Sequence, residues 1–241
     1  MPEPVSISDL TVRDLRRRWK PHKERLSAIR SDHPTLIRFH RACSWLDRVE
    51  KMDTNQDSDL ALICLWIAFN ALYGQWDQGE REPVPDRECW RVFMDRMVDL
   101  DHTGYLAQTL TEHKRLVLSL LDDPYLSSLF WRSPENILLE QTHKEKYAAA
   151  TWFNEQNWKL ILERLMERIY MIRCQLVHGA ATHGGQLNRA SLRHCVTMLG
   201  HLMRPTLLIL IDHGADEDWG IMCYPPMNGA HQPPQPNHRH R

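Results

Sequence analysis

The segment from Phe153 to His178 carries the most regular pattern in the chain, and it limits the fold most. Apolar residues recur there every three or four positions between charged ones, which is the spacing of one face of an α-helix. The apolar positions are Leu160, Leu162, Leu165, Ile169, Ile172 and Leu176. Gly179 follows and predicts that the helix stops there, because glycine adopts the left-handed conformation that ends many helices.

Helical periodicity extends over most of the chain. It predicts further helices over 34–49, 60–73, 90–100, 106–121 and 188–210. The stretch from Leu60 to Tyr73 is apolar almost throughout, so we expect a central buried helix that is capped near Asp57 and ends at Gly74. Convincing alternation of polar and apolar residues is absent. We therefore predict an all-α fold.

Prolines and turn residues predict where these helices are interrupted. Pro21 is expected to interrupt the first helical pattern, and Pro205 to kink or break the last one. Residues 78–85 are polar and predict a loop, and residues 122–134 predict short helices and loops.

We divide the chain into three parts. Residues 1–55 are expected to form an N-terminal helical extension packed on the bundle, and residues 56–224 the helical bundle itself. Residues 225–241 are rich in histidine and proline and have almost nothing to bury, so we expect a disordered tail.

Composition excludes several classes of protein. The formal net charge of −1 argues against a protein that coats nucleic acid by bulk charge, so any contact with RNA needs a local patch. Six cysteines without a C-x-x-C pair favour reduced, buried thiols over a zinc site. The start of the chain lacks the pattern of a signal peptide, and its apolar runs are too short to span a bilayer. We expect a cytoplasmic protein that uses no metal or cofactor and has no membrane partner.

The candidate site is Arg173-Cys-Gln-Leu-Val-His178-Gly179, at the end of the most regular helix. No aspartate or glutamate occurs between Glu167 and Asp212, which suits a site for phosphate. Arginine stays charged and its planar fork fits two phosphate oxygens, while histidine exchanges protons near neutral pH. An ideal helix places the two side chains about 140° apart around its axis, so they converge only if the last turn distorts or if two copies meet. The same spacing also suits a solvated arginine and a histidine that interacts with the helix dipole.

Two segments resemble the HEPN superfamily. The stretch from Ile172 to Gly179 is similar to its signature, an arginine followed by a few variable residues and a histidine near a helix end. Leu65-Trp-Ile-Ala-Phe-Asn-Ala-Leu-Tyr-Gly74 resembles the buried helix that precedes this signature in several bacterial families. The resemblance covers about residues 60–210.

The resemblance implies a HEPN-like helical bundle that forms a dimer with the Arg/His cleft at the interface. In many members this cleft cuts RNA without a metal, and many act as toxins of toxin–antitoxin modules or in antiviral defence. It implies Arg173 and His178 as catalytic residues, with Cys174 and Gln175 beside them. It also places Asn70 near the cleft, although a buried amide that holds a neighbouring helix in register fits equally well.

Asn188, Arg189 and Arg193 begin the helix after the candidate loop, and we assign them to RNA binding because they can face the same cleft. The leading hypothesis is a metal-independent endoribonuclease that acts on RNA, forms a homodimer and has an antitoxin or defence-complex protein as partner. The alternative is a non-catalytic helical module that binds RNA or protein, or a scaffold of a defence complex. Cys174, which stands where many active members have a polar residue, favours this alternative.

Overall fold

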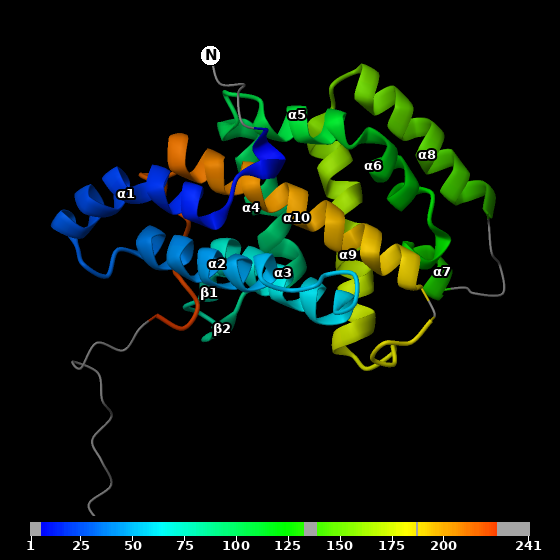
Figure 1. The fold of residues 1–241 in the computed structure, drawn as a ribbon, viewed down its shortest axis with the longest axis horizontal. Coiled ribbons are helices and arrows are strands. Elements are labelled where there is room, and N and C mark those ends of the chain that lie inside the picture. The colour runs from blue at the N-terminus through cyan, green and yellow to red at the C-terminus, as the bar shows by residue number, and fades with distance from the viewer. Residues whose placement is uncertain (1–5, 133–138, 187, 226–241) are drawn as a thin grey trace, which may run out of the picture.

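The structure is a computed structural model that describes residues 6–132, 139–186 and 188–225, with the backbone alone at 129 and 139–145. It confirms the predicted all-α fold (Figure 1). The long helices are α1 (Val12–Ile29), α2 (Pro34–Glu50), α3 (Ser58–Tyr73), α4 (Asp86–Leu100), α8 (Leu139–Asn154), α9 (Trp158–Val177) and α10 (Arg189–Asp212). The shorter ones are η1 (Ile7–Asp9), α5 (Tyr105–Glu112), α6 (Lys114–Leu121), η2 (Pro124–Leu126) and α7 (Ser128–Arg132).

The centre of the fold is α3, as its apolar sequence predicts. Ten of its 16 residues are buried, and it packs against α2 on one side and α10 on another. It ends at Tyr73 with Gly74 as its C-terminal cap, which confirms the predicted stop. At its start Asp57 is the N-cap but makes no capping hydrogen bond through its side chain. The remaining face of α3, which includes Leu60 and Ile67, is not fully covered by the described residues.

The predicted N-terminal extension shares the core of the bundle. Leu15 of α1 and Phe39 of α2 belong to the same buried cluster as Leu65 of α3 and Leu207 of α10. Within the described residues, no separate core therefore marks the boundary drawn at residue 55. The predicted disordered tail lies outside the described residues, apart from its first residue, Pro225.

Both prolines lie inside continuous helices, so the predicted interruption at Pro21 is wrong, and of the kink or break predicted at Pro205 the break is excluded. α1 continues through Pro21, which is exposed, so water can solvate the carbonyl that loses its backbone donor. The opposite face of α1 is buried through Trp19 and Leu26, and this packing holds the helix together. α10 likewise runs unbroken through Pro205, because packing on both sides of the proline outweighs the lost hydrogen bond.

Smaller differences concern the turns. The predicted loop at residues 78–85 contains part of a hairpin, in which β1 (Trp76–Asp77) pairs antiparallel with β2 (Glu82–Pro83). The carboxylate of Asp77 accepts hydrogen bonds from two backbone N–H groups of the turn, and these hold the hairpin closed. The pattern over 106–121 is divided into α5 and α6 at His113. The regular segment predicted from Phe153 is divided, because Phe153 and Asn154 end α8 and α9 begins at Trp158, after a turn in which Gln156 has a positive φ of 55°.

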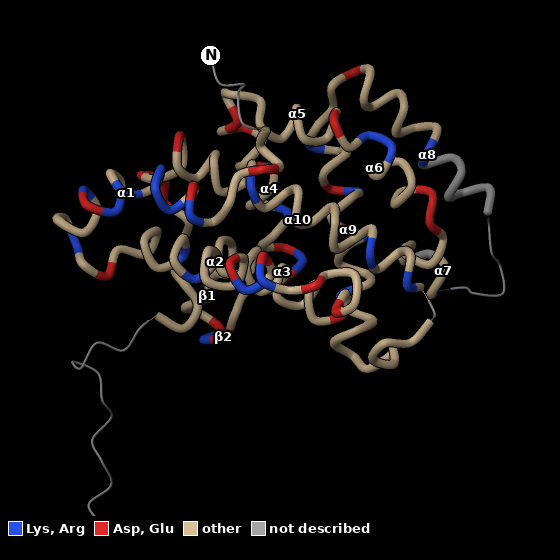
Figure 2. The backbone as a smooth tube through the Cα atoms, in the orientation of Figure 1, with Lys and Arg blue, Asp and Glu red and all other residues tan. Residues whose placement is uncertain are grey.

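α10 is long and apolar enough to cross a membrane by length and composition alone. However, 72% of its most apolar window is buried inside the protein, and core helices of soluble proteins show the same property. Basic and acidic residues are interspersed over the remaining helices (Figure 2).

Candidate functional site

The candidate motif lies at the C-terminal end of α9. Asn157 caps the start of this helix by accepting a hydrogen bond from the N–H of Leu160, and its apolar stripe is buried against the core. Arg173 lies in the last turns and His178 is the C-terminal cap. Gly179 follows with a φ of 71°, so it ends the helix in the left-handed conformation, as predicted.

Arg173 is held by three neighbours. A terminal nitrogen of its guanidinium lies 3.5 Å from Oδ2 of Asp86, the first residue of α4. The guanidinium carbon lies 5.6 Å from the ring centre of Trp66 and 5.8 Å from that of Tyr170. These distances are typical of cation–π contacts. The charge of Arg173 is therefore fixed in position before any ligand arrives.

Asp86 also collects two hydrogen bonds from α3. Its Oδ1 accepts one from Nδ2 of Asn70 at 3.0 Å and one from the hydroxyl of Tyr73 at 2.5 Å. Burial, and then the charge of Asp86, raise the pKa of Tyr73 well above its ordinary value, so this hydroxyl remains a donor at neutral pH. Asp86 thus links α3, α4 and α9. Asn70 and Arg173 both contact its carboxylate, one at each oxygen.

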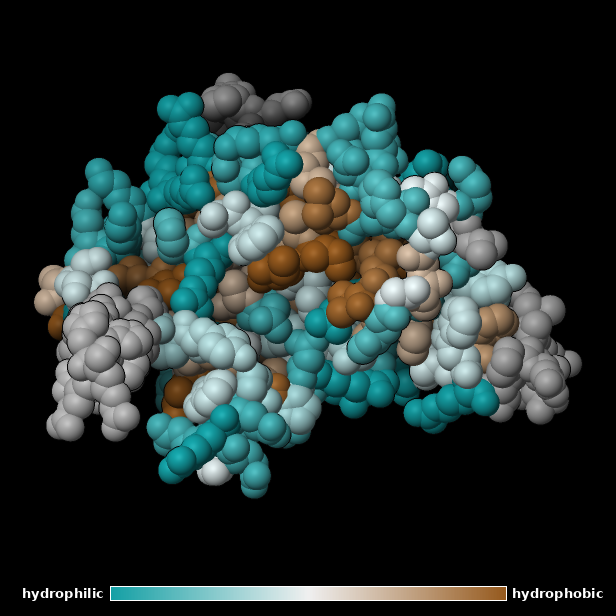
Figure 3. Space-filling model, turned by 90° about the horizontal axis from the view of Figure 1, so that it is seen from below, coloured by the Kyte–Doolittle hydropathy of each residue, from teal (hydrophilic) through white to brown (hydrophobic). Residues whose placement is uncertain are grey.

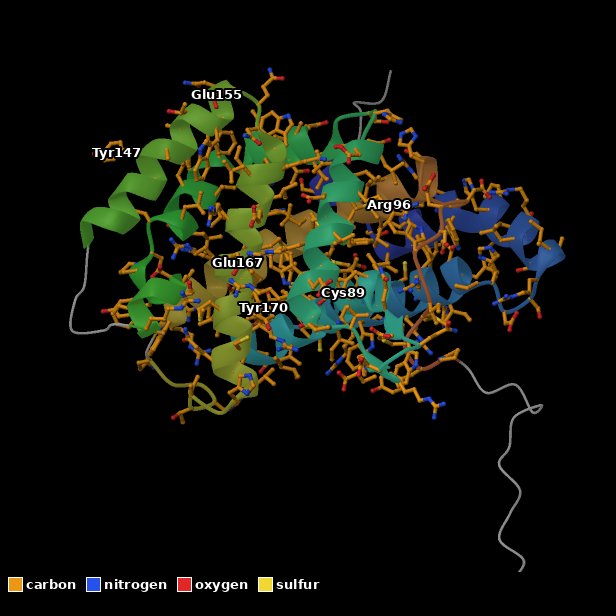
Figure 4. The ribbon with its side chains drawn as sticks, turned by 180° about the vertical axis from the view of Figure 1, so that it is seen from behind. Cys89, Arg96, Tyr147, Glu155, Glu167 and Tyr170 are labelled. Carbon is orange, nitrogen blue, oxygen red and sulfur yellow. The ribbon has the colours of Figure 1, made fainter. Side chains whose placement is uncertain are left out.

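These residues line a cavity of about 600 Å³. Its walls come from α2, α3, the β1–β2 hairpin, α4, α9 and the C-terminal segment after α10. In the view from behind, Tyr170 lies on α9 and Cys89, one of the lining residues, on the neighbouring α4 (Figure 4). Arg173 and Asn70 are the only residues of the predicted site among those that line the cavity.

His178 lies elsewhere. Its side chain is exposed, and it does not belong to the lining of the cavity. Its backbone N–H donates to the carbonyl of Cys174 at 2.9 Å, which completes the last turn of the helix. Within one chain, the described contacts of Arg173 therefore do not include the imidazole expected to act with it.

The two predicted supporting residues of the motif point in different directions. Cys174 lies beside Tyr170, and burial, followed by the interaction with Cys174, raises the pKa of Tyr170 to about 12. Gln175 instead donates through Nε2 to the carbonyl of Tyr125 at 3.2 Å, and its Oε1 lies 3.5 Å from Nδ2 of Asn188. Gln175, on α9, therefore links η2 to the start of α10.

The predicted RNA-binding residues have different surroundings. Arg189 forms an ion pair with Asp59 at 2.9 Å, and each side chain is only 13% exposed. It also donates to the carbonyl of Gly185, so it anchors the loop between α9 and α10 and is not free for phosphate. Arg193 is exposed, whereas Asn188 has a φ of 54° at the start of α10.

The segment between Glu167 and Asp212 contains no aspartate or glutamate, but carboxylates from other parts of the chain contact it in the folded protein. Asp86 reaches Arg173 and Asp59 reaches Arg189, both from earlier helices. What remains without charged side chains of these types is the path from residue 174 to residue 186, which Figure 2 shows as a tube without Lys, Arg, Asp or Glu.

Sequence reasoning missed Asp86, the residue that organises the cavity. It is one of two acidic residues in the first turn of α4, where acids are common for the sake of the helix dipole, so it carries no signal of its own. The useful signal lies in α3, where Asn70 and Tyr73 place polar groups three residues apart on an apolar helix. Such a pair needs a polar partner when it is buried.

Among the described residues, no group of three or more His, Cys, Asp or Glu side chains is placed to hold a metal ion. No protein-family model, curated protein or solved structure matches this chain.

Proposed function

We propose that the protein is a metal-independent endoribonuclease of HEPN type, cytoplasmic, and part of a toxin–antitoxin or antiviral defence system. One observation carries the proposal: a guanidinium fixed beside an open cavity shares a helix end with an exposed imidazole. Arg173 is positioned by Asp86 and two aromatic rings, and His178 is accessible to a substrate or a second subunit.

In this reaction the ribose 2′-oxygen attacks the adjacent phosphorus, and the bond from phosphorus to the 5′-oxygen breaks. The products are a 2′,3′-cyclic phosphate and a free 5′-hydroxyl. His178 of one subunit accepts the proton of the 2′-OH, and a second imidazole gives a proton to the leaving oxygen. Arg173 stabilises the charge that develops on the phosphoryl oxygens.

A homodimer would supply the second imidazole. Five residues of helix correspond to a rise of about 7.5 Å, so Arg173 and His178 of one chain are offset along α9 and both can contribute to one interface. Val177, next to His178, is 52% exposed, and Leu60 of α3 is 47% exposed. Figure 3 shows a hydrophobic patch near the centre of the face that looks down in Figure 1, the side on which α2, α3 and the hairpin lie. Apolar surface of this kind favours contact with another protein.

The test is cleavage of RNA by the purified protein in the presence of EDTA. We expect products that end in 2′,3′-cyclic phosphate, and a loss of rate of at least about 100-fold in both Arg173→Ala and His178→Ala. His183→Ala is the matched control, because His183 is an exposed histidine of the following loop and should leave the rate unchanged. Full activity of the two site variants would refute these roles.

The dimer has its own test in solution. Val177→Glu replaces an exposed apolar side chain beside His178 with a charged one, so it should convert a dimer into a monomer on light scattering and lower cleavage with it. Cleavage by a protein that is monomeric before the substitution would contradict the need for a second subunit.

The second candidate function is a non-catalytic module that binds RNA or a partner protein. The observation in its favour is that Arg173 is already paired with Asp86, while His178 lies outside the cavity. Expression in a bacterial host separates the two: growth arrest that disappears in His178→Ala favours the nuclease. Retention of RNA or of a defence-complex protein by both forms, without cleavage, favours the module.

A further inference from the structure

Two cysteines that are far apart in the chain lie beside the β1–β2 hairpin. Cys89 lies in the first turns of α4 (Figure 4), and Cys223 lies in the segment after α10. The thiol of Cys223 donates to the carbonyl of Gln75 at 2.8 Å, and the thiol of Cys89 donates to the carbonyl of Val84 at 3.8 Å. The backbone N–H of Val84 donates in turn to the carbonyl of Gln75 at 3.0 Å. Both sulfur atoms are therefore held at the same pair of hydrogen-bonded residues.

The two thiols are also close enough to act on one another. Burial raises the pKa of Cys89, the carbonyl of Gln75 acts against this rise, and the charge of a Cys223 thiolate raises the pKa further. Gln75 thus lies beside both sulfur atoms. Both cysteines line the cavity of about 600 Å³ described above, so small solutes can reach them from that side.

Two arginines of α2 hold the backbone around Cys223 in place. Arg38 is only 1% exposed, and its terminal nitrogens donate to four carbonyl groups at 2.9–3.2 Å. Two of these groups lie at the end of α3 and two in the segment after α10, namely those of Leu72, Gly74, Trp219 and Gly220. Arg41 donates to the carbonyl of Cys223 at 3.3 Å and to that of Tyr224 at 2.8 Å. The segment that carries Cys223 is therefore fixed against the rest of the fold.

The surroundings of Cys223 make it the more reactive of the two cysteines. It is half-buried, whereas Cys89 is only 4% exposed. Burial raises the pKa of Cys223, and the positive charges of Arg38 and Arg41 act against this rise. Partly exposed cysteines with cations nearby are the ones that react, because the cations stabilise the thiolate.

We infer that Cys89 and Cys223 form a reversible disulfide when the protein meets a peroxide. The two residues are then a site of oxidative modification that joins α4 to the segment after α10. Both thiols are free in the reduced protein. The inference does not depend on RNA cleavage, because neither thiol has a part in the proposed reaction.

The reaction with hydrogen peroxide has two steps. The thiolate of Cys223 attacks one peroxide oxygen, the O–O bond breaks, and the other oxygen leaves as hydroxide, which takes up the thiol proton. The products are a sulfenic acid and water. Cys89 then attacks the sulfur of this sulfenic acid, the S–O bond breaks, and the hydroxyl group leaves with the proton of Cys89 as a second water. The peroxide is reduced, the two thiols are oxidised, and a dithiol reductant restores them by thiol–disulfide exchange.

Peptide mapping of the full chain tests this inference. The folded, reduced protein is treated with hydrogen peroxide, its remaining thiols are alkylated, and it is digested without reduction. We expect one pair of peptides joined through residues 89 and 223, about 2 Da lighter than the sum of the two reduced peptides. Dithiothreitol should separate the pair. The Tm of the oxidised protein should rise by at least about 5 °C, because the bond closes a long loop in the unfolded chain.

Two substitutions remove one partner each. Cys223→Ser keeps a donor for the carbonyl of Gln75, and Cys89→Ala fills a buried position with a small apolar side chain. Each variant should lose both the joined peptides and the rise in Tm. Cys174→Ser is the matched control, because Cys174 is the other half-buried cysteine, and it should keep both effects.

Three results would overturn the inference. In the first, the thiols of residues 89 and 223 remain open to alkylation after treatment with peroxide. In the second, Cys223 is oxidised to a sulfinic acid and no bond to Cys89 forms. In the third, the bond joins other cysteines or two copies of the chain, which the joined peptides and the mass of the intact product reveal.

Discussion

Arg173 and His178 lie five residues apart on the same helix, and their surroundings have little in common. Arg173 is enclosed by side chains from α3, α4 and its own helix, and every one of these contacts involves a residue that is buried or half-buried. His178 is exposed at a helix end, where Gly179 and the residues that follow it up to Gly184 are exposed as well. The first position is fixed by partners distant in sequence and the second by a local stop signal. A site built across both positions has one rigid half and one half that a substrate or a second subunit must complete.

The largest expected effect of a substitution lies in the rigid half. Asp86→Ala removes the partner of Arg173, Asn70 and Tyr73, so it should lower the free energy of unfolding by about 3 kcal/mol. Chemical denaturation measures this change. Asp99→Ala, on the same helix but in an exposed ion pair with Lys159, is the control and should change it by less than about 0.5 kcal/mol.

His178→Ala should likewise change the free energy of unfolding by less than about 0.5 kcal/mol, because the side chain is exposed. Equal losses in Asp86→Ala and His178→Ala would contradict the contrast between the two halves.

The next largest effect concerns Asp59, which pairs with Arg189 and holds the loop that follows His178. Burial alone would raise the pKa of Asp59, but the hydrogen bond from the N–H of Gly184, together with the hydrogen bond and charge of Arg189, leaves it below the ordinary value. Because the pKa of Asp59 is lowered, its interactions with Arg189 and Gly184 stabilise the protein above about pH 4, and this contribution is lost as the pH falls further.

Asp59→Asn should therefore cost about 2 kcal/mol of unfolding free energy at pH 7. The difference between the variant and the unchanged protein should shrink as the pH falls below about 4, which denaturation at a series of pH values measures. A difference that stays constant down to pH 3 would argue against the ion pair as its cause.

The smallest effect is expected at Gly179, which ends α9. Gly179→Ala should cost about 1 kcal/mol, because alanine is strained at a φ of 71° while its Cβ would meet no atom within 4 Å. Gly200→Ala is the matched control of opposite sign. Its Cβ also meets nothing within 4 Å, and Gly200 lies inside α10, where alanine is the better helix former. Thermal melts of both variants give the comparison, and stabilisation by Gly179→Ala would contradict the assigned conformation.

Much of the fold follows from local signals in the sequence. The apolar stretch of α3, its end at Gly74 and the end of α9 at Gly179 are all read from neighbouring residues, and the structure has them. The prolines show the limit of such signals. Pro21 and Pro205 disfavour helix locally, but burial of the residues around them depends on other helices and outweighs that preference.

The candidate site was less predictable for the same reason. The absence of carboxylates between Glu167 and Asp212 is a property of the linear sequence, whereas Asp59 and Asp86 reach the arginines through the packing of α3 and α4. Arg38 gave no signal either, since an arginine in an amphipathic helix is usually solvated and nothing in its neighbourhood indicates four distant carbonyl groups.

Those carbonyl groups have a consequence for the C-terminal part of the chain. Arg38 bridges the end of α3 to Trp219 and Gly220, so one side chain closes a link between residues 72–74 and residues 219–220. A chain truncated before Trp219 would lack two of the four carbonyl groups that accept from Arg38. The buried guanidinium would then have unpaired donors in a nonpolar interior. The segment after α10 is thus held to the end of α3 through the buried Arg38. It belongs to the folded core, and shortened versions of the protein should retain it.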